Sequence, residues 1–366
     1  MLLQNLLNFV TLSNFVNLTT YMTNIHPNHI AQNPAEQQAI DWLQEWASEK
    51  QAFRIMTSGS TGAPKAIQIT RKQMKCSAVL TLKALQLKEG DSMLINLNCE
   101  YIAGKMMLVR GMEGEMNMYF TEPSSNPLLT IDNNTFDFLS FVPLQIETIL
   151  TQTPEKITIL NAAKAIIIGG APISLSLEKA LQNIKAPVYH TYGMSETVSH
   201  IALRRVNGKE RSAYFNTLNG ISIGVDDRQC LRLNHDVSGN QDVISNDIIE
   251  LISPTAFKWL GRADDVINSG GVKIIPTQVE EKLASIFDQL AIQNRFFVFG
   301  LPHATLGSSV NLLIEAALHP NLVQSLKDEM ANGLSVYERP KAMFFVEKFK
   351  ETLTQKIDRT KTVLLM

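Results

Sequence analysis

The 366-residue chain has only three cysteines, Cys76, Cys99 and Cys230, and they are scattered along it. An odd, scattered set excludes a disulfide framework and a CxxC metal site, and is typical of the reducing cytoplasm. No apolar run is long enough to span a bilayer. A net charge of −2 offers no positive excess for nucleic acid. We therefore expect a cytoplasmic protein whose partners include neither nucleic acid nor a membrane into which it inserts.

Lysine and arginine are absent before Lys50, and asparagines interrupt the apolar stretch over residues 1–20. A secretion signal needs a basic start and an uninterrupted apolar block, so the pattern argues against one. We expect residues 1–35 to form a mobile leader, with Met22 as an alternative translation start.

Short β-rich runs alternate with helical stretches from Ala52 to about Tyr192. Several runs are continuously apolar, as expected for strands covered on both faces. This alternation predicts an α/β fold with a mainly parallel sheet flanked by helices. The expected strands are 52–56, 66–70, 93–97, 115–120, 136–142, 165–168 and 188–191, and the expected helices are 71–86, 102–111, 144–150 and 175–183.

The pattern changes twice further along the chain. From about Ser212 to Trp259, short apolar runs separated by Gly, Asn and Asp predict a small antiparallel β region. After Gly261, helical and strand patterns predict a small α+β unit. We expect a large N-terminal domain over 36–262 and a small, mobile C-terminal domain over 265–366.

The segment Thr57-Ser58-Gly59-Ser60-Thr61-Gly62-Ala63-Pro64-Lys65 directly follows the first expected strand and combines hydroxyls, glycines and a lysine. Such groups can surround a polyphosphate, because glycine lets the backbone approach and lysine supplies charge. Pro64 before Lys65 and Ala66 after it exclude a Walker A loop. Taken alone, the segment is also typical of a plain surface turn.

Tyr192-Gly193-Met194-Ser195-Glu196-Thr197 follows the strand at 188–191, at the end where open α/β sheets bind ligands. Glu196 is suited to hold Mg²⁺ near phosphate, and Tyr192 to stack on a base. Ser195 and Glu196 are equally suited to cap a helix. Gly169-Gly170-Ala171-Pro172 also follows a strand, and it is suited either to seat a flat ring or to form a simple turn.

Two segments near the C-terminus carry charge. In Gly261-Arg262-Ala263-Asp264-Asp265, Arg262 lies fifteen positions after Asp247, and a carboxylate with a guanidinium suits ribose and phosphate oxygens. A surface salt bridge explains Arg262 equally well without context. Thr354-Gln355-Lys356-Ile357-Asp358-Arg359, taken alone, is typical of a solvated basic face.

These five segments, in this order from Thr57 to Arg359, resemble those of the adenylate-forming acyl-CoA synthetase superfamily, the AMP-binding enzymes. Each segment is ambiguous alone, but the combination is specific. The resemblance implies an acid–thiol ligase that uses ATP, Mg²⁺ and CoA.

The resemblance also implies roles, residue by residue. The catalytic residues would be Lys356, Glu196 and Lys65, with Glu196 as the metal ligand. The ATP and AMP site would comprise Thr57, Ser58, Gly59, Thr61, Gly62, Gly169, Gly170, Ala171, Tyr192, Gly193, Ser195, Asp247 and Arg262. Asp264 would be the hinge, and Gly270 and Gly271 would line the CoA tunnel.

Within the superfamily, the chain most resembles the 2-succinylbenzoate–CoA ligases of menaquinone biosynthesis, in a short form of the Bacteroidetes type. The residues that carry this resemblance are Tyr101 to Met107 with Arg110, Ser195 to Arg204, and Ile267 to Lys273. The implied substrate is a small aromatic dicarboxylic acid, whose spectator carboxylate needs a cation or several donors when buried. Candidates for that contact are Lys105, Arg110, Ser199 and His200, together with Arg204.

Two alternatives stay open. One is another small aryl or acyl acid, passed to CoA or to a carrier protein. The other is a catalytically silent nucleotide-binding protein, although competent residues occupy the three catalytic positions. The chain also departs from the family pattern, because little sequence precedes Thr57 and because Asn98-Cys99-Glu100-Tyr101 stands where members carry an aromatic residue or histidine, so no gate residue is assigned.

Overall fold

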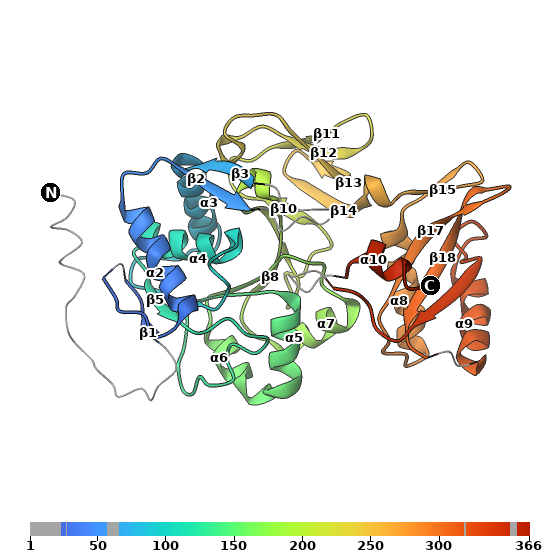
Figure 1. The fold of residues 1–366 in the computed structure, drawn as a ribbon, viewed down its shortest axis with the longest axis horizontal. Coiled ribbons are helices and arrows are strands. Elements are labelled where there is room, and N and C mark those ends of the chain that lie inside the picture. Colours follow the sequence, from blue (N-terminus) through green and yellow to red (C-terminus); the bar gives the residue numbers. More distant parts are fainter. Residues whose placement is uncertain (1–22, 27, 57–65, 318–319, 352–356) are drawn as a thin grey trace.

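The computed structural model describes residues 23–26, 28–56, 66–317, 320–351 and 357–366. Figure 1 shows a large unit that contains the N-terminal part of the chain and a small unit at the opposite end that contains the C-terminus. None of the helices in these ranges is long and apolar enough to cross a membrane.

A single twelve-stranded sheet runs through the large unit. The central strands β5, β4, β6, β7 and β8 are parallel neighbours, and every later pair is antiparallel. In spatial order the strands are β1 (Thr23–Asn24), β5 (Asn117–Phe120), β4 (Ser92–Ile95), β6 (Phe138–Phe141), β7 (Ala165–Ile168), β8 (Val188–Gly193), β9 (His200–Arg205), β10 (Phe215–Thr217), β14 (Ala256–Arg262), β13 (Val243–Ser253), β12 (Cys230–Leu233) and β11 (Ile223–Val225). The parallel half and the antiparallel region expected from the sequence are therefore both present, joined at β8 and β9.

Helices cover both faces of the parallel half. Met93 and Ile95 point to one core, with α2 (Pro34–Ala47), α3 (Arg71–Ala84) and α4 (Ile102–Glu113). Leu94 points to a second core, with α5 (Pro143–Gln152), α6 (Ile157–Ala162) and α7 (Leu175–Ala180). Because alternate residues of β4 enter different cores, the continuous apolar run at this strand has a direct physical explanation.

Two strands expected in the parallel sheet lie elsewhere. β2 (Ala52–Met56) and β3 (Ala66–Thr70) pair only with each other, as an antiparallel hairpin. Residues 57–65 join the two strands, so both ends of that segment are held together by the Met56–Ala66 pair. The expected strand ranges were correct, but these two strands do not belong to the parallel sheet. The connection over 57–65 is too short for a parallel crossover, so the strands pair antiparallel.

The expected leader also needs a correction at its C-terminal end. Thr23 and Asn24 pair with β5, Ile25 is buried in the core, and α2 begins at Pro34. Asn33 caps α2 by accepting a hydrogen bond from the Glu36 amide at 2.9 Å. Part of the range 1–35 is thus a structural component of the large unit.

The small unit contains a five-stranded sheet with two helices on one face. Its strands are β16 (Val272–Ile274), β15 (Ile267–Ser269), β18 (Gly307–Glu315), β17 (Phe296–His303) and β19 (Ala342–Val346), of which only β19 runs parallel to its neighbour β18. The helices α8 (Pro276–Gln289) and α9 (Pro320–Gly333) cover one face, and α10 (Arg359–Val363) contributes Val363 to the other. This confirms the expected α+β architecture.

Candidate functional site

The predicted phosphate residues Thr57, Ser58, Gly59, Thr61, Gly62 and Lys65, and the predicted catalytic Lys356, lie outside the described residues. Their roles stay predictions. The described residues flanking them are Met56 and Ala66 on one side, and Glu351 and Ile357, which form a β-bridge, on the other.

Three strands bring the predicted nucleotide residues Tyr192, Asp247 and Arg262 together. The Tyr192 hydroxyl donates to Asp247 Oδ2 at 2.8 Å, and Arg262 Nη1 lies 4.0 Å from Asp247 Oδ1. Asp247 on β13 stands directly opposite Arg262 on β14. The Trp259 indole N–H also donates to Asp247 Oδ1, at 3.2 Å. The carboxylate is thus oriented by two neutral donors, and it remains able to accept from hydroxyl groups of a ligand.

The Tyr192 ring is buried, with only 9% of its surface exposed. It packs edge-on against Phe257 at 5.0 Å between centroids, and it lies 5.8 Å from Phe215. Burial and the Asp247 carboxylate raise the pKa of the phenol well above its usual value, so the hydroxyl stays a donor. Stacking of Tyr192 on adenine stays a prediction.

The turn Gly169-Gly170-Ala171 follows β7 and lies beside β8. A Cβ at Gly169 would lie 2.2 Å from the Thr191 hydroxyl, so only glycine fits here. His190 Nε2 lies 3.3 Å from the Ala171 carbonyl oxygen, while its Nδ1 is buried without a partner among the described residues. Burial lowers the His190 pKa to about 4, so the ring is neutral and donates through Nε2.

Ser195 and Glu196 begin a short 3-10 helix, Ser195–Thr197, which Met194 separates from Gly193 at the end of β8. The Glu196 carboxylate is exposed and makes no ion pair or hydrogen bond within the described part of the chain. Such a carboxylate fits the donor set that a mostly hydrated Mg²⁺ prefers. No cluster of three His, Cys, Asp or Glu residues suited to a metal occurs among the described residues.

A buried polar cluster lies between α3, α4 and β9. Arg110 is 2% exposed, and its Nη2 donates to the Ser199 hydroxyl at 2.6 Å. Its Nη1 lies 3.9 Å from Met107 Sδ. Within the described residues no carboxylate pairs with this guanidinium, and its Nε has no partner. Burial lowers the Arg110 pKa to about 10. A buried cation without a counter-ion destabilises the folded protein, and an anion that pairs with it removes part of this free-energy cost.

His200 belongs to the same cluster. Its Nε2 lies 3.0 Å from the Thr81 hydroxyl, and its Nδ1 lies 3.5 Å from the Ser199 hydroxyl. Burial and the nearby Arg110 lower the His200 pKa well below its usual value. The cluster forms because Gly193 lets β9 approach: a Cβ there would lie 2.4 Å from the His200 Cα.

The other two candidates for the acyl site have different surroundings. Lys105 donates to the Glu100 carbonyl oxygen at 3.1 Å, and its ammonium lies 4.9 Å from the Trp42 ring centroid. Arg204 pairs with Glu178 on α7 at 3.0 Å. The structure therefore brings Arg110, Ser199 and His200 together, but it places neither Lys105 nor Arg204 in contact with them.

The predicted hinge and tunnel residues follow β14. Asp264 accepts from Arg262 Nη2 at 2.8 Å and from the Asn246 amide at 3.3 Å. Gly270 and Gly271 form the two-residue turn between β15 and β16, with φ values of +59° and +82°. These positive φ values explain two successive glycines, because other residues rarely adopt them.

Sequence reasoning did not identify three residues that contact the predicted site. They are Trp259 beside Asp247, Thr81 beside His200, and His190 beside Ala171. Each contact joins residues 12 to 119 positions apart, so no local pattern reveals it. Only the contact between Trp259 and Asp247 was indicated by the sequence, since antiparallel strands were expected in this region.

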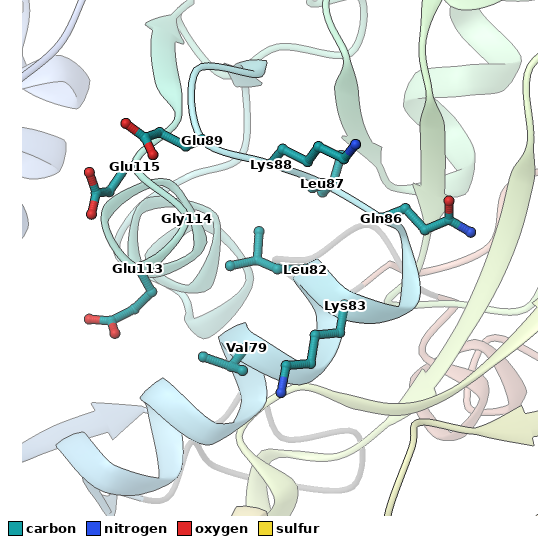
Figure 2. Close-up of a pocket in the computed structure, with 10 residues that line it drawn as sticks. All are labelled: Val79, Leu82, Lys83, Gln86, Leu87, Lys88, Glu89, Glu113, Gly114 and Glu115. Carbon is teal, nitrogen blue, oxygen red and sulfur yellow. The ribbon is translucent and has the colours of Figure 1, made fainter.

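A surface hollow of about 420 Å³ lies between the C-terminal ends of α3 and α4. Figure 2 shows its polar rim, where Lys83 and Lys88 face one side and Glu113 and Glu115 the other. Both charge signs are present, and none of the ten lining residues belongs to the predicted site. We therefore assign no function to this hollow.

Comparison with known proteins identifies relatives. The family model described as AMP-binding enzyme matches residues 16–225. A 2-succinylbenzoate–CoA ligase of Listeria monocytogenes is 24% identical over 348 residues, which cover 87% of this chain and 71% of the relative. A ligase of the same name from Lactococcus lactis is 23% identical, with 86% and 71% coverage.

Two solved structures have a similar fold. A Dyadobacter fermentans protein, described as an acyl-CoA synthetase (AMP-forming)/AMP-acid ligase II-like protein, is 41% identical, with a TM-score of 0.64 over 94% of this chain and 99% of that one. The O-succinylbenzoate coenzyme A synthetase of Bacillus subtilis, solved with ATP and magnesium, is 22% identical, with a TM-score of 0.68 over 85% and 69%. The family model covers more than half of the chain, and the chain therefore belongs to the AMP-binding enzyme family.

Proposed function

We propose that this protein activates 2-succinylbenzoate with ATP and transfers the acyl group to CoA. The observation that carries the substrate assignment is the buried Arg110 guanidinium, which has no carboxylate partner within the described residues. A dicarboxylic acid has one carboxylate to activate and one to pair with this cation. The names of the relatives support the same substrate.

A carboxylate is a poor acyl donor because its leaving group would be oxide. In the proposed first step, a carboxylate oxygen attacks the α-phosphorus of ATP, the bond to pyrophosphate breaks, and an acyl-adenylate forms. Lys65 and Lys356 are the cations of this chain proposed to stabilise the negative charge that develops there. Glu196 would hold Mg²⁺, which supplies further positive charge when bound. In the second step the CoA thiol loses its proton and attacks the acyl carbon, and AMP leaves.

Asp247 and Arg262 are proposed to hold the ribose. The Asp247 carboxylate is already oriented by Tyr192 and Trp259, so binding a ribose requires little reorganisation of this side chain. The Gly169-Gly170-Ala171 turn is proposed to seat the adenine and the adjoining acyl group, with His190 holding the Ala171 carbonyl.

Acid-dependent pyrophosphate release, measured with and without CoA, tests the proposal. The panel contains 2-succinylbenzoate, benzoate, succinate and a long-chain fatty acid. We expect turnover with 2-succinylbenzoate and a CoA-dependent thioester product. An ¹⁸O label in the activated carboxylate should appear in AMP. A response to fatty acid with none to 2-succinylbenzoate would overturn the substrate assignment, and ATP binding without any acid-dependent turnover would favour a silent nucleotide-binding protein.

A second candidate is a monocarboxylic aryl acid handled by the same chemistry. It would leave Arg110 without an anion. Comparison of 2-succinylbenzoate with its spectator-carboxamide analogue therefore separates the two candidates. Equal KM values for the pair would favour the monocarboxylic acid.

A further inference from the structure

We infer that Thr81 on α3 is a positioning residue for the acid site, acting through His200 and Ser199 on the orientation of Arg110. The inference rests on the proposed function, since it assigns a purpose to the Arg110 cluster. Thr81 is fully buried and lies 119 positions before His200 in the chain.

The direction of each hydrogen bond follows from chemistry. The Thr81 hydroxyl lies 3.0 Å from the Ser77 carbonyl oxygen, which can only accept, so the Thr81 hydrogen points there. Thr81 Oγ1 must then accept from His200 Nε2, 3.0 Å away. The buried ring is neutral and has a single N–H, so Nδ1 carries only a lone pair.

The same reasoning continues to the guanidinium. Arg110 can only donate, so the Ser199 oxygen accepts from Nη2 at 2.6 Å. The Ser199 hydrogen is then directed at the bare His200 Nδ1, at 3.5 Å. Thr81 therefore keeps the Ser199 lone pair facing Arg110. The guanidinium is held by Nη2, and its Nε, unpartnered among the described residues, is left for an anion.

Loss of the Thr81 hydroxyl removes the acceptor for His200 Nε2–H. The ring then has its better partner through the Nδ1–H tautomer, which would donate to the Ser199 oxygen, so that this oxygen would accept from both the ring and Arg110. The guanidinium would share its acceptor with the ring, and the Ser199 hydrogen would lose its acceptor His200 Nδ1, so the Ser199 hydroxyl would reorient relative to Arg110. The structure thus assigns the orientation of the Arg110 side chain to a threonine on another helix.

The experiment compares Thr81→Val, which removes the hydroxyl, with Thr81→Ser, which keeps it. Thr148→Val is the matched control, because Thr148 is also a buried helical threonine bonded to the carbonyl four residues earlier. For each variant, ¹⁵N NMR of the histidine rings reports the His200 tautomer. Initial rates give kcat and the KM values for 2-succinylbenzoate and ATP.

We expect Thr81→Val to shift the His200 tautomer and to raise the acid KM about three- to tenfold, the effect of one buried hydrogen bond. The ATP KM should not change, and Thr81→Ser and Thr148→Val should behave as wild type. An unchanged tautomer in Thr81→Val, or equal effects of Thr81→Val and Thr81→Ser, would overturn the inference.

His200→Gln and His200→Leu keep the inference testable if Thr81→Val does not fold. Glutamine keeps an N–H donor for Thr81 and leucine does not, so His200→Leu should raise the acid KM more than His200→Gln does. Equal acid KM values for the two variants would overturn the inference. A wild type without turnover on any acid would refute the proposed function alone. In that event the His200 tautomer in wild type and Thr81→Val decides whether Thr81 positions the ring.

Discussion

The Asp288 carboxylate on α8 lies 2.6 Å from the Lys179 ammonium on α7, and this ion pair joins the small unit to the large one. Both side chains are about half exposed, so the pair contributes little to overall stability. Lys258 and Glu281 form a second contact between the units, at 3.8 Å. These two contacts favour the arrangement of the units seen in Figure 1.

We propose that the two half-reactions use two arrangements of the small unit relative to the large one. Asp288→Asn, which removes a contact between the units, should then change the balance between these arrangements. We expect adenylation and thioester formation to change in opposite directions, each by no more than about fivefold. Single-turnover rates of the two steps measure this. The charge swap Lys179→Asp with Asp288→Lys should restore the balance, whereas Glu338→Gln, which breaks the Lys282 pair within the small unit, should not alter it.

Arg110→Met should separate stability from activity. Removing a buried, unpaired cation should leave the melting temperature of the ligand-free protein unchanged or raise it. The KM for 2-succinylbenzoate should rise about 10- to 100-fold, because a charged hydrogen bond to the acid is lost. Arg205→Met is the control, since Arg205 is already paired with Asn207 and Glu210. A large loss of stability in Arg110→Met would assign this arginine a structural role instead.

Lys356→Ala should abolish acyl-adenylate formation but largely spare thioester formation from preformed acyl-adenylate. The lysine is proposed to stabilise the negative charge that develops at the α-phosphorus in the first step. In the second step the reacting centre is the acyl carbon and not the α-phosphorus. Pyrophosphate release and CoA consumption, assayed separately, test the assignment. An equal loss in both steps would show that the proposed role is wrong.

The lowered pKa values of His190 and His200 predict that the folded protein loses stability in acid. Burial lowers both pKa values, that of His190 to about 4, whereas an unfolded histidine titrates near 6.5. The unfolded state therefore binds more protons as the pH falls below about 6.5. The contribution of the two histidines to the free energy of unfolding is complete above that pH. It is lost progressively as the pH falls towards the pKa values of the folded protein.

His190→Gln, which keeps a donor but cannot titrate, should flatten the dependence of the unfolding free energy on pH. The expected reduction is about 1.4 kcal/mol per pH unit near pH 5, the value for one proton. Urea titrations followed by tryptophan fluorescence measure it, because Trp42, Trp46 and Trp259 all belong to the large unit. A slope equal to that of wild type would contradict the assignment of a neutral His190.

Local patterns predicted several elements accurately, and the physical reason is clear. The strands at 52–56 and 165–168 match the structure because the alternation of apolar residues in the first and the continuous apolar run in the second are local signals of a strand. Their partners were harder to predict, since pairing depends on contacts that are remote in sequence. The helix Pro34–Ala47 was missed although Asn33, Pro34 and Glu36 form a recognisable helix start.

The residues of the candidate site also fall into those that the sequence identified and those that it did not. Asp247 and Arg262 were identified from a resemblance and stand opposite each other in the sheet. Trp259 and Thr81 were not identified, because a tryptophan on a strand and a threonine on a helix have no local mark of function. Their contacts arise from strand register and from helix packing against β9.

Arg262 lies between two carboxylates with different proposed tasks: Asp264 at 2.8 Å, at the proposed hinge, and Asp247 at 4.0 Å, at the proposed ribose site. A nucleotide that attracts this guanidinium would weaken its contact with Asp264, so in this proposal nucleotide binding and movement of the C-terminal unit would be thermodynamically linked. By reciprocity, rotation that frees Arg262 would tighten the grip on the sugar to the same extent.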